Sequence, residues 1–107
     1  MKRGDLVTVA LHSGYDKPCP ALVIQPDLFD EHPSVTILPV TIALCDTPLF
    51  RIAEPPSVKN RLLKPSQVMV DKPQTVSREK IGEAFGRLDD DAMFASNRAL
   101  AVFLGFA

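Results

Sequence analysis

Apolar and polar side chains alternate in several short stretches of this chain. Residues 5–11 alternate from Leu6 to Val9, and their β-branched members favour a half-buried strand. The same reasoning predicts five further strands, at residues 21–25, 35–43, 49–53, 66–71 and 83–88. Pro39 interrupts the third of these and cannot donate to a ladder, which predicts an edge or a bulge there.

The pattern changes at residue 89. Asp89, Asp90 and Asp91 can cap a helix and complement its positive end. Apolar residues then recur at helical spacing up to Gly105, at Ala92, Met93, Ala99, Leu100, Phe103 and Leu104. We therefore predict one C-terminal helix of about four turns.

Prolines divide the β region. All 10 prolines fall between residues 18 and 73, where they separate short strands by tight corners. Short strands at close spacing with one terminal helix predict a mainly β, α+β fold: a small, strongly bent barrel with the helix packed on it. The 107 residues are expected to form a single domain, 1–107.

Charge is unevenly distributed although the net charge is only −1. Residues 47–88 carry eight basic and four acidic groups, whereas residues 1–46 carry three and six, and residues 89–107 carry one and three. The middle of the chain can thus face an anion or an acidic partner. An ordinary mixture of solvated charges explains the same distribution equally well.

Neither export nor metal binding is indicated. No run of 18 apolar residues exists, and the start of the chain turns polar too early for a signal peptide, so we expect a cytoplasmic protein that does not enter a membrane. Cys19 and Cys45 then fit a reducing compartment as thiols, and neither their number nor their spacing suggests zinc. No cofactor is expected.

Seven segments in order resemble the MazF/PemK toxins. Their order and spacing span the chain from residue 3 to residue 106: RGDLVTVAL, KPCPALVIQ, LPVT, KPSQVMVDK, TVSREKIG, FGRLDD and NRALAVFLGF. The resemblance implies a homodimer of SH3-like barrels that acts as the toxin of a type II toxin–antitoxin system. It also implies an mRNA interferase, a metal-independent endoribonuclease that cleaves single-stranded RNA and inhibits growth, and an acidic antitoxin that neutralises it.

The resemblance also suggests catalytic residues. RNA cleavage by the ribose 2′-hydroxyl needs proton transfer and positive charge or hydrogen-bond donors at the phosphate. Thr41 matches the threonine of the family, although β-propensity alone would explain a threonine in a strand. The family arginine falls on Cys19, whose thiol lacks both the charge and the forked donors, and Lys17 is the best substitute.

Six residues are expected to bind the RNA. His12 can move a proton near neutral pH, Tyr15 can stack on a base, and Gln67 can read a base edge. Ser66 starts a strand at which the family contacts RNA, and Lys64 and Lys72 bracket it with charge. Solvated loop or rim positions are the alternative reading for His12, Tyr15 and Lys17.

Two further positions stand out near the basic surface. Asp71 is expected to be a structural hydrogen-bonding acid. Relatives often show Asn-Gly where this chain has Asn60-Arg61, and arginine is costly in a left-handed turn, so we expect the connector to differ there.

Cys19 keeps a second function open, that of a catalytically impaired homologue that dimerises and binds its antitoxin without cleaving RNA. A gyrase poison similar to CcdB shares the barrel. That family ends its helix in a tryptophan-containing tail, whereas this chain has no tryptophan and ends FLGFA.

Overall fold

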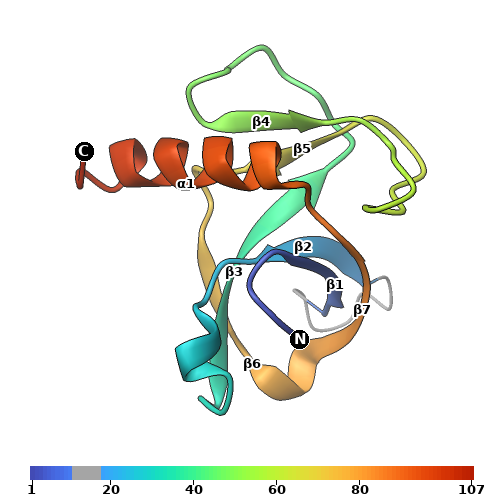
Figure 1. Cartoon of the computed structure of the whole chain (residues 1–107), viewed down its shortest axis with the longest axis vertical. Coiled ribbons are helices and arrows are strands. Elements are labelled where there is room, and N and C mark those ends of the chain that lie inside the picture. The colour runs from blue at the N-terminus through green and yellow to red at the C-terminus, as the bar shows by residue number, and fades with distance from the viewer. Residues whose placement is uncertain (11–17) are drawn as a thin grey trace.

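The computed structural model describes residues 1–10 and 18–107 (Figure 1). In this part of the chain, seven strands precede one α-helix: β1 (Asp5–Val9), β2 (Cys19–Val23), β3 (Ser34–Thr41), β4 (Arg51–Glu54), β5 (Ser66–Met69), β6 (Gln74–Ser77), β7 (Ile81–Arg87) and α1 (Asp90–Phe103). Two short 3-10 turns, Asp27–Phe29 and Arg78–Lys80, precede β3 and β7.

The strands form one antiparallel sheet in the order β4-β5-β3-β2-β1-β7, and β6 pairs with β3 beside this path. In Figure 1, β3 runs from the lower group of strands to the upper group, where α1 lies alongside β4. The predicted mainly β fold with a C-terminal helix is confirmed. No ladder within the described residues joins β4 to β7, so the sheet is strongly bent but open.

Pro39 lies where β3 changes partner. One side of β3 pairs with β2, and the other side pairs with β6 over residues 34–37 and with β5 over residues 40–41. The Ile24 amide donates to the Thr36 carbonyl, so alternate residues along β3 bond to β2 and the nitrogen of Pro39 points away from β2. It points into the gap between the two ladders, where the missing N–H costs little.

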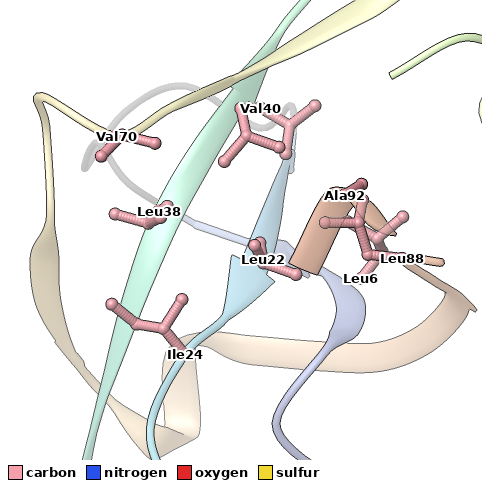
Figure 2. Packing of buried hydrophobic residues seen from close by; sticks show 9 residues of the cluster. Leu6, Leu22, Ile24, Leu38, Val40, Val70, Leu88 and Ala92 are labelled. Atoms are coloured by element: carbon pink, nitrogen blue, oxygen red, sulfur yellow. The ribbon is translucent and has the colours of Figure 1, made fainter. Parts of the chain in front are cut away.

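Both faces of the central strands are buried. Leu6, Leu22, Leu38 and Val40 belong to a cluster that includes Ala92 of α1 (Figure 2). The alternate residues of the same strands form a second cluster on the opposite face: Val7, Val9, Ala21, Val23, Val35 and Ile37. Each buried leucine or isoleucine contributes about 1.5–3 kcal/mol by leaving water. Two-sided burial therefore fixes the register of β1, β2 and β3.

Helix α1 has defined caps at both ends. The Asp89 carboxylate accepts a hydrogen bond of 2.7 Å from the Ala92 amide and so caps the first turn. At the other end, the Phe106 amide donates to the Ala101 carbonyl and Gly105 adopts φ 83°, which is a Schellman motif. The predicted helix is confirmed, from the N-cap at Asp89 to the glycine at residue 105.

One strand was missed, and the bounds of others shift. β6 was missed because its four residues include no buried side chain and only Val76 is half-buried, so backbone pairing with β3 holds it. The fourth predicted strand, 49–53, instead spans residues 51–54, because residues 48–50 form a turn.

Residues 55–65, between β4 and β5, form a connector built around Asn60. The side chain of Asn60 is buried: it accepts hydrogen bonds from the amides of Ser57 and Leu62, each 2.9 Å, and donates to the carbonyl of Pro55. Arg61 then adopts φ 55°. Arginine thus occupies a left-handed turn here, contrary to the expectation that the connector would avoid one, at a cost of about 1–2 kcal/mol relative to glycine.

Gly86 of β7 lets the sheet approach this connector. A β-carbon at Gly86 would lie 2.2 Å from the carbonyl oxygen of Asn60, whose backbone is held in place. We expect Gly86→Ala to destabilise the protein by about 1–3 kcal/mol in urea unfolding. Gly82→Ala is the matched control, because its β-carbon meets the Thr8 hydroxyl, a side-chain atom that can rotate away. Equal losses in the two variants would contradict the prediction.

Candidate functional site

Three candidate residues, Cys19, Thr41 and Gln67, lie in one row across three strands. The ladder between β2 and β3 ends at the pair Ala21 and Pro39, and the same register extended by two residues would set Cys19 opposite Thr41. Thr41 in turn pairs with Gln67 of β5. Paired residues point to the same face of a sheet, and this is the face of the second core cluster. We call these three residues the Cys19–Thr41–Gln67 row.

Thr41 ends β3 and is half-buried. Its Oγ1 accepts a hydrogen bond of 3.0 Å from the Ala43 amide, which fixes the turn that leaves the strand. A hydroxyl that accepts one hydrogen bond keeps its proton to donate. Thr41 can therefore donate to a phosphoryl oxygen without losing its structural contact.

Gln67 is engaged by the segment between β3 and β4. Its Nε2 donates to the Cys45 carbonyl at 2.9 Å, and its Oε1 accepts from the Cys45 amide at 3.1 Å. The side-chain amide thus pairs with this backbone as a neighbouring strand would. The donor and acceptor that we expected to read a base edge hold the segment at residues 42–50 in this structure.

Cys19, the position to which the resemblance assigns the family arginine, begins β2 and is half-buried. All three members of the row are uncharged. Lys17, His12 and Tyr15 lie outside the described residues, and their suggested roles stay predictions.

Ser66 does not join the row. Because side chains alternate along β5, Ser66 points to the face opposite Gln67, where it is 4% exposed and its hydroxyl donates to the Lys64 carbonyl. Lys64 and Lys72 are exposed and lie before and after β5. The structure thus separates the predicted RNA-binding residues between two faces.

A cavity of about 400 Å³ opens on the face of Ser66, and we call it the connector pocket. Its apolar walls include Pro20, Ile42, Leu62 and Phe85, and Arg61 and Lys64 bring positive charge to it. Pro20 and Ile42 directly follow Cys19 and Thr41 in sequence. The connector pocket and the row therefore border the same strand ends from opposite faces.

Asp71 is committed to an ion pair. Its carboxylate accepts from Nε of Arg51 at 3.0 Å, and both side chains are largely buried. This geometry agrees with the structural role expected for Asp71. The ion pair also leaves the Arg51 side chain only 12% exposed, so Arg51 adds little to the charged surface.

Glu54, which the sequence did not single out, is a buried carboxyl group at the end of β4. It is 3% exposed, and its Oε2 has no hydrogen-bond partner among the described residues. Burial raises the pKa of Glu54, the nearby Asp89 carboxylate raises it further, and a hydrogen bond from Asn60 opposes both effects. The Glu54 carboxyl group therefore lies close enough to Asp89, the N-cap of α1, for the two to interact electrostatically.

Comparison with known proteins identifies the lineage. Residues 2–104 match the family described as the PemK-like, MazF-like toxin of type II toxin–antitoxin systems. The chain belongs to this family. It is 44% identical to a probable endoribonuclease MazF of Mycolicibacterium smegmatis, over all of this chain and 99% of that protein.

Solved structures share the fold. An endoribonuclease in complex with its cognate antitoxin, from a mycobacterial species, superposes with a TM-score of 0.82 at 25% identity, over 100% of this chain and 97% of the other. The Mycobacterium tuberculosis toxin MazF-mt6 gives 0.81 at 22% identity, over 96% and 98% of the two chains. MazF from Deinococcus radiodurans gives 0.79 at 22%, over 98% and 96%.

Two kinds of feature are absent from residues 1–10 and 18–107. No group of three or more histidine, cysteine or acidic side chains there is arranged to hold a metal ion. No helix in the same residues is long and apolar enough to span a membrane.

We predict that Gln67→Ala frees the segment at residues 42–50. Losing two hydrogen bonds to Cys45 should speed amide hydrogen exchange at Cys45 by about tenfold or more, measured by NMR. Gln74→Ala is the control, since it removes an exposed glutamine at the start of β6. Unchanged exchange at Cys45 would show that Gln67 does not anchor the segment.

Glu54→Gln should stabilise the protein more at pH 7 than at pH 4. The folded state holds the Glu54 proton more tightly than the unfolded chain does, so the wild type loses stability as pH rises from the ordinary carboxyl range through the folded pKa. Glutamine does not ionise and escapes that loss.

Urea unfolding at both pH values measures the effect. Glu83→Gln, which neutralises an exposed carboxylate of β7, is the control. A Glu54→Gln difference that is the same at pH 4 and pH 7 would refute the linkage.

Proposed function

We propose that this chain is the toxin of a type II toxin–antitoxin system and cleaves single-stranded RNA without a metal ion. The observation that carries the proposal is the Cys19–Thr41–Gln67 row, which presents a threonine hydroxyl with an available proton beside the position of the family arginine. The relative that is 44% identical over the whole chain is a probable endoribonuclease, which supports the same activity here.

The reaction needs no covalent enzyme intermediate. The ribose 2′-oxygen forms a bond to the adjacent phosphorus while the bond from phosphorus to the 5′-oxygen breaks. A base takes the 2′-hydroxyl proton, and an acid returns a proton to the 5′-oxygen, leaving a 2′,3′-cyclic phosphate and a 5′-hydroxyl. Thr41 donates to a phosphoryl oxygen as negative charge develops there. His12 is the candidate for proton transfer, and Lys17 for charge neutralisation.

The proposed partners are an acidic antitoxin and a second copy of the chain. A structural neighbour is an endoribonuclease in complex with its cognate antitoxin, and the basic excess in residues 47–88 suits an acidic segment. The dimer is supported by apolar surface on α1: Phe94 and Val102 are 63% and 58% exposed, beside Leu49 at 77%. Such a patch favours burial against another protein.

We place the action of this protein in the cytoplasm and its target in cellular RNA, so that its activity inhibits growth. The two cysteines are thiols, which suits a reducing compartment.

Cys19 supports a second candidate, a homologue that dimerises and binds its antitoxin but does not cleave RNA. A thiol cannot hold a phosphate through a charged, forked pair of donors as arginine does. If this second function is correct, the wild type is inactive and Cys19→Arg restores cleavage.

The decisive measurement is incubation of the purified protein with a long RNA in EDTA, followed by analysis of the new ends. We expect 2′,3′-cyclic phosphate or its ring-opened product from the wild type, and a rate about 10²–10³-fold lower for Thr41→Ala. Thr36→Ala is the control, because Thr36 lies on β3 away from the row and bonds to Thr75.

Normal cleavage by Thr41→Ala would show that the site is misassigned. Absence of wild-type cleavage, with activity gained in Cys19→Arg, would establish the second candidate instead.

A further inference from the structure

The Cys19–Thr41–Gln67 row has no charge, whereas the proposed reaction builds negative charge on a phosphate. A hydroxyl donor alone stabilises that charge less than a cation does. Two cations among the described residues, Arg61 and Lys64, line the connector pocket, which borders the same strand ends. Their backbones come from the connector, not from the strands of the row.

Arg61 is held in an unfavourable backbone conformation. Within the described part of the chain, Arg61 is the only residue other than glycine that has a positive φ, of 55°. Such conformations persist only where the surrounding structure imposes them. Here the buried Asn60 side chain fixes the turn, the Arg61 amide donates to the Ser57 carbonyl, and the Arg87 amide of β7 donates to the Lys59 carbonyl.

The fold gains nothing visible from the guanidinium of Arg61. The side chain is exposed, and it makes no hydrogen bond or ion pair within residues 1–10 and 18–107. Glycine would relieve the backbone at this position. A strained residue whose charged group makes no hydrogen bond or ion pair with the described residues suggests a ligand as the contact that favours arginine.

The connector pocket has the composition that a nucleotide needs. Pro20, Leu62 and Phe85 give it apolar walls against which a base can lie, and its volume of about 400 Å³ falls in the usual range for small-ligand sites. Arg61 and Lys64 supply the positive charge for a phosphate. An arginine on a rigid backbone can offer two parallel N–H donors to that phosphate.

We propose that Arg61 binds a phosphate of the single-stranded RNA at the connector pocket, with Lys64 beside it and one base against the apolar walls. Arg61 thereby supplies positive charge that the neutral Cys19 position does not. This assignment rests on the proposed function for the identity of the ligand. The assignment goes beyond the proposed function because it names Arg61 as an RNA contact and the connector pocket as the place of that contact.

Arg61→Gly separates a ligand role from a structural one. Removing the guanidinium should weaken binding of a 2′-O-methyl single-stranded RNA, which cannot be cleaved, by on the order of tenfold, measured by fluorescence anisotropy. The slope of log affinity against log salt should become shallower by about 0.7, as expected for one lost phosphate contact. The same variant should have a higher unfolding temperature, because glycine accepts the left-handed turn.

Lys59→Gln is the matched control. It removes one positive charge two residues earlier on the same connector, and Lys59 does not line the pocket. We expect its RNA affinity to stay within about twofold of the wild type, since it loses only long-range attraction. Arg61→Lys should retain part of the affinity, because it keeps the charge and loses the forked donors.

The outcomes separate this inference from the proposed function. A wild type that binds the 2′-O-methyl RNA but cleaves no RNA defeats the proposed activity, and weakened binding by Arg61→Gly still supports the Arg61 assignment. An Arg61→Gly variant that binds RNA like Lys59→Gln, with the same salt dependence, overturns the assignment even if the wild type cleaves. Failure of the wild type to bind RNA overturns both.

Discussion

The exchange of partners along β3 is the constraint on which the rest of the structure depends. One edge of this strand stays with β2, while the other passes from β6 to β5 across the gap at Pro39. Proline is suited to that gap because its nitrogen has no proton to leave unpaired. The exchange brings β5 beside the end of β3 and lets the two parts of the sheet bend over separate core clusters.

The same exchange arranges the candidate chemistry on two faces. Thr41 and Gln67 meet because β5 replaces β6 as the neighbour of β3, and Cys19 enters their row through the register with β2. The alternate residues of these strands face the other way, toward the connector pocket. A strand of RNA that contacts both faces must pass the shared strand ends, near Pro20 and Ile42. Under the proposed function, with Arg61 as an RNA contact, substrate binding and cleavage are divided between neighbouring surfaces.

Strong local signals made much of the fold predictable from sequence. Alternation identified β1, and the cap at Asp89 with the glycine at residue 105 defined α1. β6 lacked such a signal because it has no buried side chain. The candidate site was harder to predict. Thr41 and Cys19 emerged through family resemblance. Ser66 shares the face of the buried Val68 and Val70, so alternation along β5 does predict its burial, although the resemblance assigned it to RNA binding. The hydrogen bonds of Gln67 to Cys45 join segments far apart in sequence, which local patterns do not encode.

The buried core and the candidate site use different residues, so we expect the fold to accept a change of side chain at residue 19. Cys19 is half-buried at the first residue of β2, outside both buried clusters, so a change of side chain there leaves the packing of Ala21 and Leu22 intact. Arg61 presents the opposite case, because the strain lies in the backbone while its side chain is exposed. A neutral side chain in place of a cation at a half-buried strand end costs the fold little stability. An arginine in a left-handed turn, in contrast, destabilises the folded backbone. Stability therefore does not favour arginine at residue 61, and under the proposed function RNA binding is the contribution that favours it.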